Sequence, residues 1–217
     1  MIFLEPFKFP ILLEKLDIDS HNIIREYVLS LYNDNDNNTK EGNFYGTGFT
    51  TTFFDDYTGH LNNVKEFSEL KEKILFYANQ YLTNTITELH IKHPEAKLHF
   101  SKIEELIIKR MWFNVNPQHG YQGNHHHADY LLAGTYYIDV PENSRTPEFS
   151  NPSAYSYLKN QCPIETHLTL SNFRIDTKSK DLLIWPGHLS HEVKTNKSIE
   201  NRITASFCID WKSSHAE

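Results

Sequence analysis

The chain has 217 residues, of which 39% are hydrophobic and 13% aromatic, which suffices for one sizeable core and is typical of a single domain. A formal net charge of -7 at pH 7 argues against a general affinity for nucleic acid or anionic membranes, because both require clustered lysine and arginine. The first apolar residues are interrupted by Glu5, Pro6, Lys8 and Pro10, and no later run approaches the roughly 20 apolar residues of a membrane span. These features predict a cytoplasmic protein that does not associate with membranes.

Two segments of the first half have helical spacing. From Ser20 to about Tyr32, apolar residues recur every three or four positions after an Asp-Ser start, and an asparagine-rich stretch ends the pattern. The same spacing continues from Val64 to about His90. We therefore expect residues 1–95 to form a helical N-terminal part that covers the remainder of the domain.

After His93-Pro94 the pattern changes to short runs of β-forming residues separated by turn residues. The expected strands are Ile107–Val115, Leu131–Val140, Glu165–Ile175, Leu182–Trp185, Glu192–Lys194 and Arg202–Ile209. Strands without intervening helices predict an antiparallel barrel or jelly roll over residues 96–217, so the fold class is α+β with a mainly β core. The long loop from Glu142 to Pro163 is expected at the mouth of this barrel.

Histidines in two separated segments are the candidate metal ligands. His125 and His127 are two residues apart, so on a strand their imidazoles point to the same face and can bind one metal ion. Two more histidines, His188 and His191, follow the apolar strand that ends at Trp185. We favour His191 as the third ligand, because it begins the next strand whereas His188 falls inside the Pro-Gly turn.

A longer set of motifs in the second half occurs in one order along the chain. The set comprises Trp112-x-Asn114, Gly120, His125-x-His127, Ala133-Gly134-Thr135-Tyr136-Tyr137, Pro141, Asn151-Pro152, Leu183-x-Trp185-Pro186, His191-x-Val193 and Arg202-Ile203-Thr204-x-Ser206-Phe207. From Trp112 to Asp210 the chain resembles the 2-oxoglutarate- and Fe(II)-dependent oxygenase superfamily, in particular its small bacterial and phage members related to prolyl hydroxylases.

The resemblance implies a double-stranded β-helix, or jelly-roll barrel, whose mouth binds Fe(II) and the cosubstrate 2-oxoglutarate. It implies an enzyme, a dioxygenase of the hydroxylase type that releases succinate and CO2. The guanidinium of Arg202 would bind the distal carboxylate of 2-oxoglutarate, for which its planar fork is suited. Tyr137, Thr204 and Asn114 would line the same cosubstrate site.

The third metal ligand has two candidate registers. Residues His127 and Asp129 form the H-x-D pattern of the usual site with two histidines and one carboxylate. The spacing to Ala133-Gly134 instead aligns His125 and His127 with the H-x-H of the small relatives, which makes the ligand set His125, His127 and His191. We favour the second register, in which Asp129 lies outside the ligand set.

Two other functional classes are compatible with these residues. A cupin-like metalloenzyme would use the histidines without 2-oxoglutarate, and a non-catalytic barrel would bind only a partner. Arg202 separates the oxygenase from the cupin, because only a dicarboxylate cosubstrate requires a cation on the last strand. No motif identifies the substrate, and the helical N-terminal part offers a surface for a homodimer.

Overall fold

The computed structural model describes residues 9–34, 46–51, 61–92, 105–152 and 170–212. The elements within this part of the chain are β1 (Leu12–Lys15), α1 (His21–Asp34), β2 (Gly46–Thr47), β3 (Phe49–Thr50), the 3-10 turns η2 (Leu61–Asn63) and η3 (Lys65–Phe67), α2 (Ser68–Lys92), β4 (Leu106–Asn116), β5 (Tyr121–His125), β6 (Leu132–Asp139), β7 (Pro147–Ser150), β8 (Asn172–Arg174), β9 (Asp181–Pro186), β10 (His191–Val193) and β11 (Arg202–Trp211). None of the helices in these ranges combines the length and apolarity that a membrane crossing needs.

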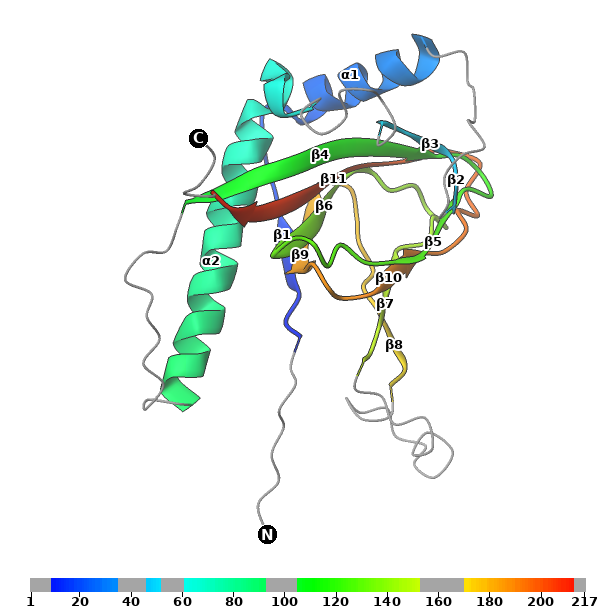
Figure 1. Cartoon of the computed structure of the whole chain (residues 1–217). Coiled ribbons are helices and arrows are strands. Elements are labelled where there is room, and N and C mark those ends of the chain that lie inside the picture. The colour runs from blue at the N-terminus through cyan, green and yellow to red at the C-terminus, as the bar shows by residue number, and fades with distance from the viewer. Residues whose placement is uncertain (1–8, 35–45, 52–60, 93–104, 153–169, 213–217) are drawn as a thin grey trace.

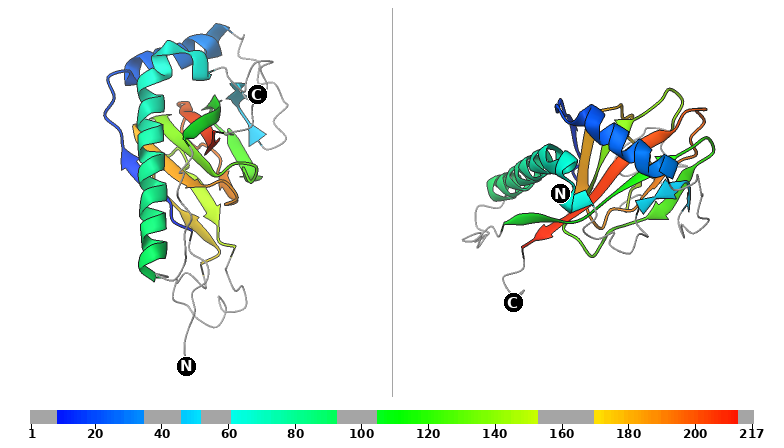
Figure 2. Two further views of the ribbon diagram at one scale, coloured as in Figure 1. Left: turned by 60° about the vertical axis from the view of Figure 1, so that its left-hand side comes forward. Right: turned by 90° about the horizontal axis from the view of Figure 1, so that it is seen from above.

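The strands form two antiparallel sheets. The main sheet has the order β1-β9-β6-β11-β4-β3, and the small sheet has the order β2-β5-β10-β7-β8. Helices α1 and α2 lie on one side of the main sheet and the small sheet lies on the other (Figure 1). Figure 2 shows the long helix α2 running beside the main sheet while α1 crosses its end. The main sheet is therefore covered on both faces.

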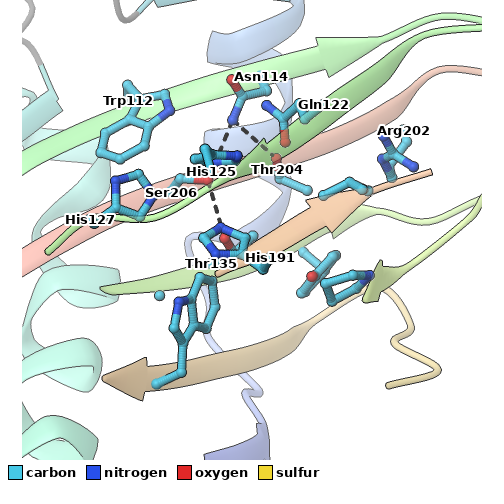
Figure 3. A pocket seen from close by; sticks show the side chains of 15 residues that line it. Trp112, Asn114, Gln122, His125, His127, Thr135, His191, Arg202, Thr204 and Ser206 are labelled. Carbon is cyan, nitrogen blue, oxygen red and sulfur yellow. Dashed lines mark hydrogen bonds between the residues drawn. The ribbon is translucent and has the colours of Figure 1, made fainter. Parts of the chain in front are cut away.

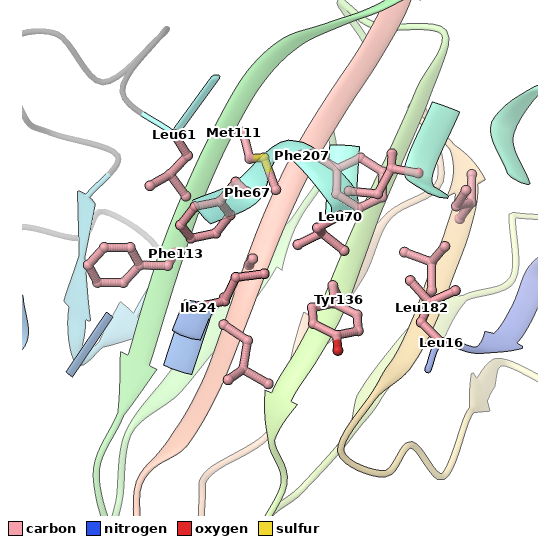
Figure 4. Packing of buried hydrophobic residues seen from close by; sticks show 14 of the residues in the cluster. Leu16, Ile24, Leu61, Phe67, Leu70, Met111, Phe113, Tyr136, Leu182 and Phe207 are labelled. Carbon is pink, nitrogen blue, oxygen red and sulfur yellow. The ribbon is translucent and has the colours of Figure 1, made fainter. Parts of the chain in front are cut away.

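The principal core fills the space between the main sheet and the helices (Figure 4). Large apolar side chains from both layers are fully buried there, among them Ile24 of α1, Leu70 of α2 and Phe207 of β11. Burying one such side chain stabilises the fold by about 2 kcal/mol. The helices thus pack on one face of the main sheet, and the small sheet covers its other face.

Alternation along the central strands separates core residues from polar ones. In β11, Ile203, Ala205 and Phe207 belong to the core, whereas Arg202, Thr204 and Ser206 line a pocket on the opposite face. The same division holds in β4, where Phe113 is a core residue and its neighbours Trp112 and Asn114 line the pocket. Because side chains alternate with period two, the pocket lies between the two sheets.

Most of the expected elements are present, with two corrections. The helices start and end close to the expected residues, and the strands expected around residues 107–115, 131–140, 182–185, 192–194 and 202–209 are all found. The expectation that residues 1–95 are helical is wrong in part, because β1 forms an edge of the main sheet and β2 and β3 add to both sheets. Of the loop expected from Glu142 to Pro163, residues 147–150 form β7, and residues 153–163 lie outside the described ranges.

Candidate metal centre

Three imidazoles converge between the two sheets. His125 ends β5, His191 begins β10, and these two residues are paired neighbours in the small sheet. His127 follows two residues after His125 and turns back toward the pair (Figure 3). One ring nitrogen from each histidine lies within 4.8 Å of the other two. The spacing of strand ends along the sheet therefore brings together the three histidines that the sequence singled out.

The backbone orients the rings of the two paired histidines. Nδ1 of His125 lies 2.8 Å from the carbonyl oxygen of Gly123, and Nδ1 of His191 lies 3.1 Å from that of Leu189. A carbonyl oxygen only accepts hydrogen bonds, so each Nδ1 carries the proton and each Nε2 keeps a lone pair. This is the tautomer that a metal ion bound through Nε2 requires.

Burial keeps all three imidazoles neutral. It lowers the pKa of His191 to about 3 and that of His127 to about 4, and it lowers the pKa of His125 below the usual range. In each case desolvation is the largest cause, and the neighbouring histidines add to it for His127 and His191. Neutral imidazoles are the form that binds divalent metals, so the ligand set needs no deprotonation step at neutral pH.

The other histidines and Asp129 of these segments lie elsewhere. His126, Asp129 and His188 are exposed, and the ring of His188 packs against Phe9. None of the three belongs to the group of ligand atoms found among the described residues. The carboxylate of the alternative H-x-D register is therefore directed to solvent in this structure.

Polar side chains from neighbouring strands form the floor of the pocket on the main sheet. The Asn114 amide donates to the hydroxyl of Ser206 at 3.3 Å and to that of Thr204 at 3.5 Å, and the Thr135 and Ser206 hydroxyls lie 3.1 Å apart. The residues come from β4, β11 and β6, which are adjacent in the sheet. Asn114 and Thr204 thus line the pocket together, and Figure 3 shows Asn114 above His125 and Thr204 beside it.

A buried guanidinium lies at one end of this pocket. Arg202 is 1% exposed, and its Nη1 donates to the carbonyl oxygens of Arg145 at 2.5 Å and Lys194 at 3.4 Å. Its Nη2 is buried and has no hydrogen-bond partner within the described part of the chain. Burial lowers the pKa of Arg202 to about 10, so the guanidinium is charged at neutral pH.

Tyr137 accompanies Arg202 in the pocket. Its side chain is 2% exposed, and burial raises the pKa of its phenol, which the charge of Arg202 opposes. The phenol therefore keeps its proton and can donate a hydrogen bond. A buried cation with one unsatisfied donor, next to a protonated phenol, favours an anionic ligand.

Several pocket residues were not predicted as site residues from the sequence. Gln122 of β5, Thr135 of β6 and Pro147 of β7 line the pocket. Thr135 could have been inferred, since it has the same parity as Tyr137 on one strand. Gln122 and Pro147 lie on strands of the small sheet that show no regular alternation of apolar residues, so the sequence carried no signal for them.

Two tryptophans, Trp112 of β4 and Trp185 of β9, line the pocket. The ring centroid of Trp112 lies 5.7 Å from that of His127, and the ring centroid of Trp185 lies 4.8 Å from that of His191. Both indoles are almost completely buried. Aromatic surface therefore packs against two of the three imidazoles.

A comparison with protein families finds a match in the second half of the chain. Residues 110–208 match the family model of 2OG-Fe(II) oxygenases, a segment that contains the three histidines and Arg202. The resemblance to the 2-oxoglutarate- and Fe(II)-dependent oxygenase superfamily is confirmed over this segment. Among curated proteins, none matches the sequence.

Solved structures share the fold at low sequence identity. SnoK, the non-heme alpha ketoglutarate dependent carbocyclase of nogalamycin biosynthesis, has a TM-score of 0.56 at 10% identity, covering 92% of this chain and 78% of SnoK. HygX from Streptomyces hygroscopicus, solved with nickel and 2-oxoglutarate, has a TM-score of 0.54 at 9% identity, covering 93% of this chain and 83% of HygX. A prolyl hydroxylase from Trichoplax adhaerens, solved with a hypoxia inducible factor peptide fragment, has a TM-score of 0.50 at 14% identity, covering 93% of this chain and 83% of that one.

Other relatives are aligned over a smaller part of their length. The chain spans about half of an oxidoreductase of the 2OG-Fe(II) oxygenase family from Burkholderia pseudomallei (48% of that chain) and of the epimerase SnoN (51% of that chain). The family match is confined to residues 110–208, and the likenesses to SnoK and HygX, which extend over more than nine-tenths of this chain, show the fold.

Proposed function

We propose that the protein is an Fe(II)- and 2-oxoglutarate-dependent oxygenase that hydroxylates a substrate, with His125, His127 and His191 as the metal ligands and Arg202 as the anchor of the cosubstrate. The two facing sheets would correspond to the double-stranded β-helix of this superfamily. The substrate class is considered separately, because neither the fold nor the family match identifies it.

One observation carries this proposal. Arg202, whose buried Nη2 has no acceptor in the described part of the chain, lines the pocket that also holds the three imidazoles. A metal site that used no dicarboxylate would gain nothing from a buried cation with an unsatisfied donor. The observation therefore favours the oxygenase over the cupin-like alternative.

The ligand set fits Fe(II). The imidazoles are neutral, two of them are held in the Nε2-binding tautomer, and one ring nitrogen of each lies within 4.8 Å of the other two. Imidazole is a common ligand for iron, and three ligands on one face leave positions for a cosubstrate and oxygen. Because none of these ligands is charged, the ion keeps its full double charge and attracts the dianionic cosubstrate more strongly than a site with a carboxylate would.

The residues of the chain bind and position the reactants. Iron(II) and 2-oxoglutarate, when bound, supply the chemistry that converts a C–H group of the substrate to C–OH while 2-oxoglutarate and O2 become succinate and CO2. Arg202 would hold the distal carboxylate, with Tyr137 as a second donor. Asn114 and Thr204 would hydrogen-bond the same ligand from the floor of the pocket. The buried indoles exclude water from the ion.

The experiment that tests the proposal is an anaerobic titration of the purified protein with Fe(II) and 2-oxoglutarate, observed through the weak visible absorption of the iron–cosubstrate chelate. We expect the band in the parent protein, its loss in His191→Ala and its weakening in Arg202→Ala. A parent protein that binds Fe(II) but never develops the band would support the cupin-like alternative, and one that binds no metal would support the non-catalytic barrel.

The two ligand registers are separated by a matched pair of variants. If the three imidazoles bind the metal, His125→Ala should lower Fe(II) affinity by about 10-fold or more, and Asp129→Asn should leave it unchanged, because Asp129 is exposed. The affinity is measured by competition with a chelator. Loss of affinity in Asp129→Asn, with His125→Ala unaffected, would establish the H-x-D register instead.

A further inference from the structure

The indole of Trp185 carries a buried donor that the fold leaves unsatisfied. Trp185 lies on β9, is 2% exposed and lines the pocket of the three imidazoles. Its Nε1 is buried and has no hydrogen-bond acceptor within the described residues. A buried N–H without an acceptor destabilises the fold, and phenylalanine would fill the same space without that penalty. The indole N–H is therefore expected to have a ligand as its partner.

The ring of Trp185 is held in place by its neighbours. Its centroid lies 4.8 Å from that of His191 at an interplanar angle of 68°, and 5.2 Å from that of Phe149 at 73°. His191 and Phe149 are in turn paired in the small sheet. The indole ring that carries the donor is thus packed against the ring of His191, one of the proposed metal ligands.

Trp185 and Arg202 lie at different positions along the strands of the main sheet. Trp185 pairs with Ala133, which pairs with Cys208 of β11, and Cys208 follows Arg202 by six residues on the same strand. Six residues span about 20 Å along a strand. Arg202 lies at the Val193 end of the small sheet, where it donates to the carbonyl of Lys194, whereas Trp185 contacts His191. The two side chains that carry unsatisfied donors therefore line different ends of the pocket.

We propose that the Nε1–H of Trp185 donates a hydrogen bond to the metal-proximal carboxylate of 2-oxoglutarate, so that Trp185 is a second cosubstrate-binding residue opposite Arg202. The inference rests on the proposed function, because it requires a dicarboxylate that extends from Arg202 to the imidazoles. Arg202 would bind the distal carboxylate, so that only a dicarboxylate of matching length reaches it from the metal site. Trp185 would orient the other carboxylate, which lies beside His191.

The first test observes the indole N–H directly. The protein has three tryptophans, and in protein loaded with diamagnetic Zn(II) their indole N–H signals are resolved by 1H–15N NMR and assigned with Trp185→Phe. On addition of 2-oxoglutarate, the Trp185 signal should move downfield more than the other two and exchange more slowly with solvent. An unshifted Trp185 signal in protein that binds 2-oxoglutarate would refute the inference.

The second test measures affinity. Trp185→Phe keeps an aromatic ring against His191 and removes only the donor, so the Kd of 2-oxoglutarate for the Zn(II)-loaded protein should rise by about 10-fold, the effect of one hydrogen bond to a charged group. Trp211→Phe, at the far end of β11 and outside the pocket, is the matched control and should bind as the parent does. Equal affinity in Trp185→Phe and the parent would overturn the assignment.

The affinity measurements distinguish the proposed oxygenase function from the proposed role of Trp185. If the Zn(II)-loaded parent binds no 2-oxoglutarate, both the proposed function and the role of Trp185 are wrong. If the parent binds it and Arg202→Ala weakens binding while Trp185→Phe does not, the oxygenase assignment stands and only the inference about Trp185 is refuted. The NMR measurement on the parent decides the question even if Trp185→Phe fails to fold.

Discussion

Replacing Arg202 by methionine should abolish tight cosubstrate binding with little effect on the stability of the ligand-free protein. The pKa of Arg202, lowered to about 10 by burial, corresponds to a penalty of about 3 kcal/mol for the buried charge. The side chain recovers about 1 kcal/mol from each of its hydrogen bonds to the carbonyls of Arg145 and Lys194. These terms nearly cancel, so Arg202→Met should change the free energy of unfolding by about 1 kcal/mol or less.

In Arg202→Met, 2-oxoglutarate would lose the hydrogen-bonded ion pair between its distal carboxylate and the guanidinium, and the methionine side chain offers no donor in its place. Removing one partner of a buried, hydrogen-bonded charge pair costs about 2–5 kcal/mol, and a loss of about 2.7 kcal/mol raises the Kd of 2-oxoglutarate by about 100-fold. Urea unfolding with and without 2-oxoglutarate measures both quantities in one assay, since a ligand of the native state raises the unfolding free energy. We expect the ligand-induced increase to be lost in Arg202→Met.

The control for this experiment is Arg25→Met, which removes a partly exposed arginine paired with Asp139 outside the pocket. It should leave the increase caused by 2-oxoglutarate at the parent value. An Arg202→Met protein that is still stabilised by 2-oxoglutarate as the parent is would contradict the assignment of Arg202. If the ligand-free Arg202→Met protein had a free energy of unfolding several kcal/mol below that of the parent, the guanidinium would instead stabilise the fold.

Three further outcomes follow from the structure. A Cβ added at Gly187 would lie 2.6 Å from the carbonyl oxygen of His127, so Gly187→Ala should displace the loop that holds this imidazole and weaken metal binding by about 10-fold, as measured by chelator competition. A Cβ at Gly134 would lie 2.2 Å from the ring of Phe207; Gly134→Ala should therefore lower the free energy of unfolding by about 1–3 kcal/mol in urea, and an unchanged midpoint would contradict the packing. Burial lowers the pKa of His21, so His21 is less protonated in the folded than in the unfolded protein, and stability present above about pH 6.5 should decline as the pH falls below that value. The metal-free His21→Gln protein should show a smaller loss between pH 7.5 and pH 5.5 than the parent, and equal losses would exclude this contribution.

The sequence by itself determined the local structure and the chemistry of the candidate site. Strong periodicity identified both long helices, because a helix that packs on one face must repeat its apolar residues every three or four positions. The central strands are buried on both faces and so appear as nearly continuous apolar runs, which the sequence also made visible. The imidazoles and the guanidinium were found because few other residue types can bind a metal ion or a dicarboxylate.

The tertiary structure decided which of these groups meet and what each of them faces. The short strands β2, β3, β5 and β7 have too few residues for a recognisable pattern, and β1 joins the main sheet only through its pairing with β9. The sequence left two registers open at the histidines, because both place suitable ligands two residues apart, and only the folded chain turns Asp129 to solvent. The unsatisfied donors of Arg202 and Trp185 are likewise properties of packing, since burial and the absence of an acceptor depend on residues far apart in the chain.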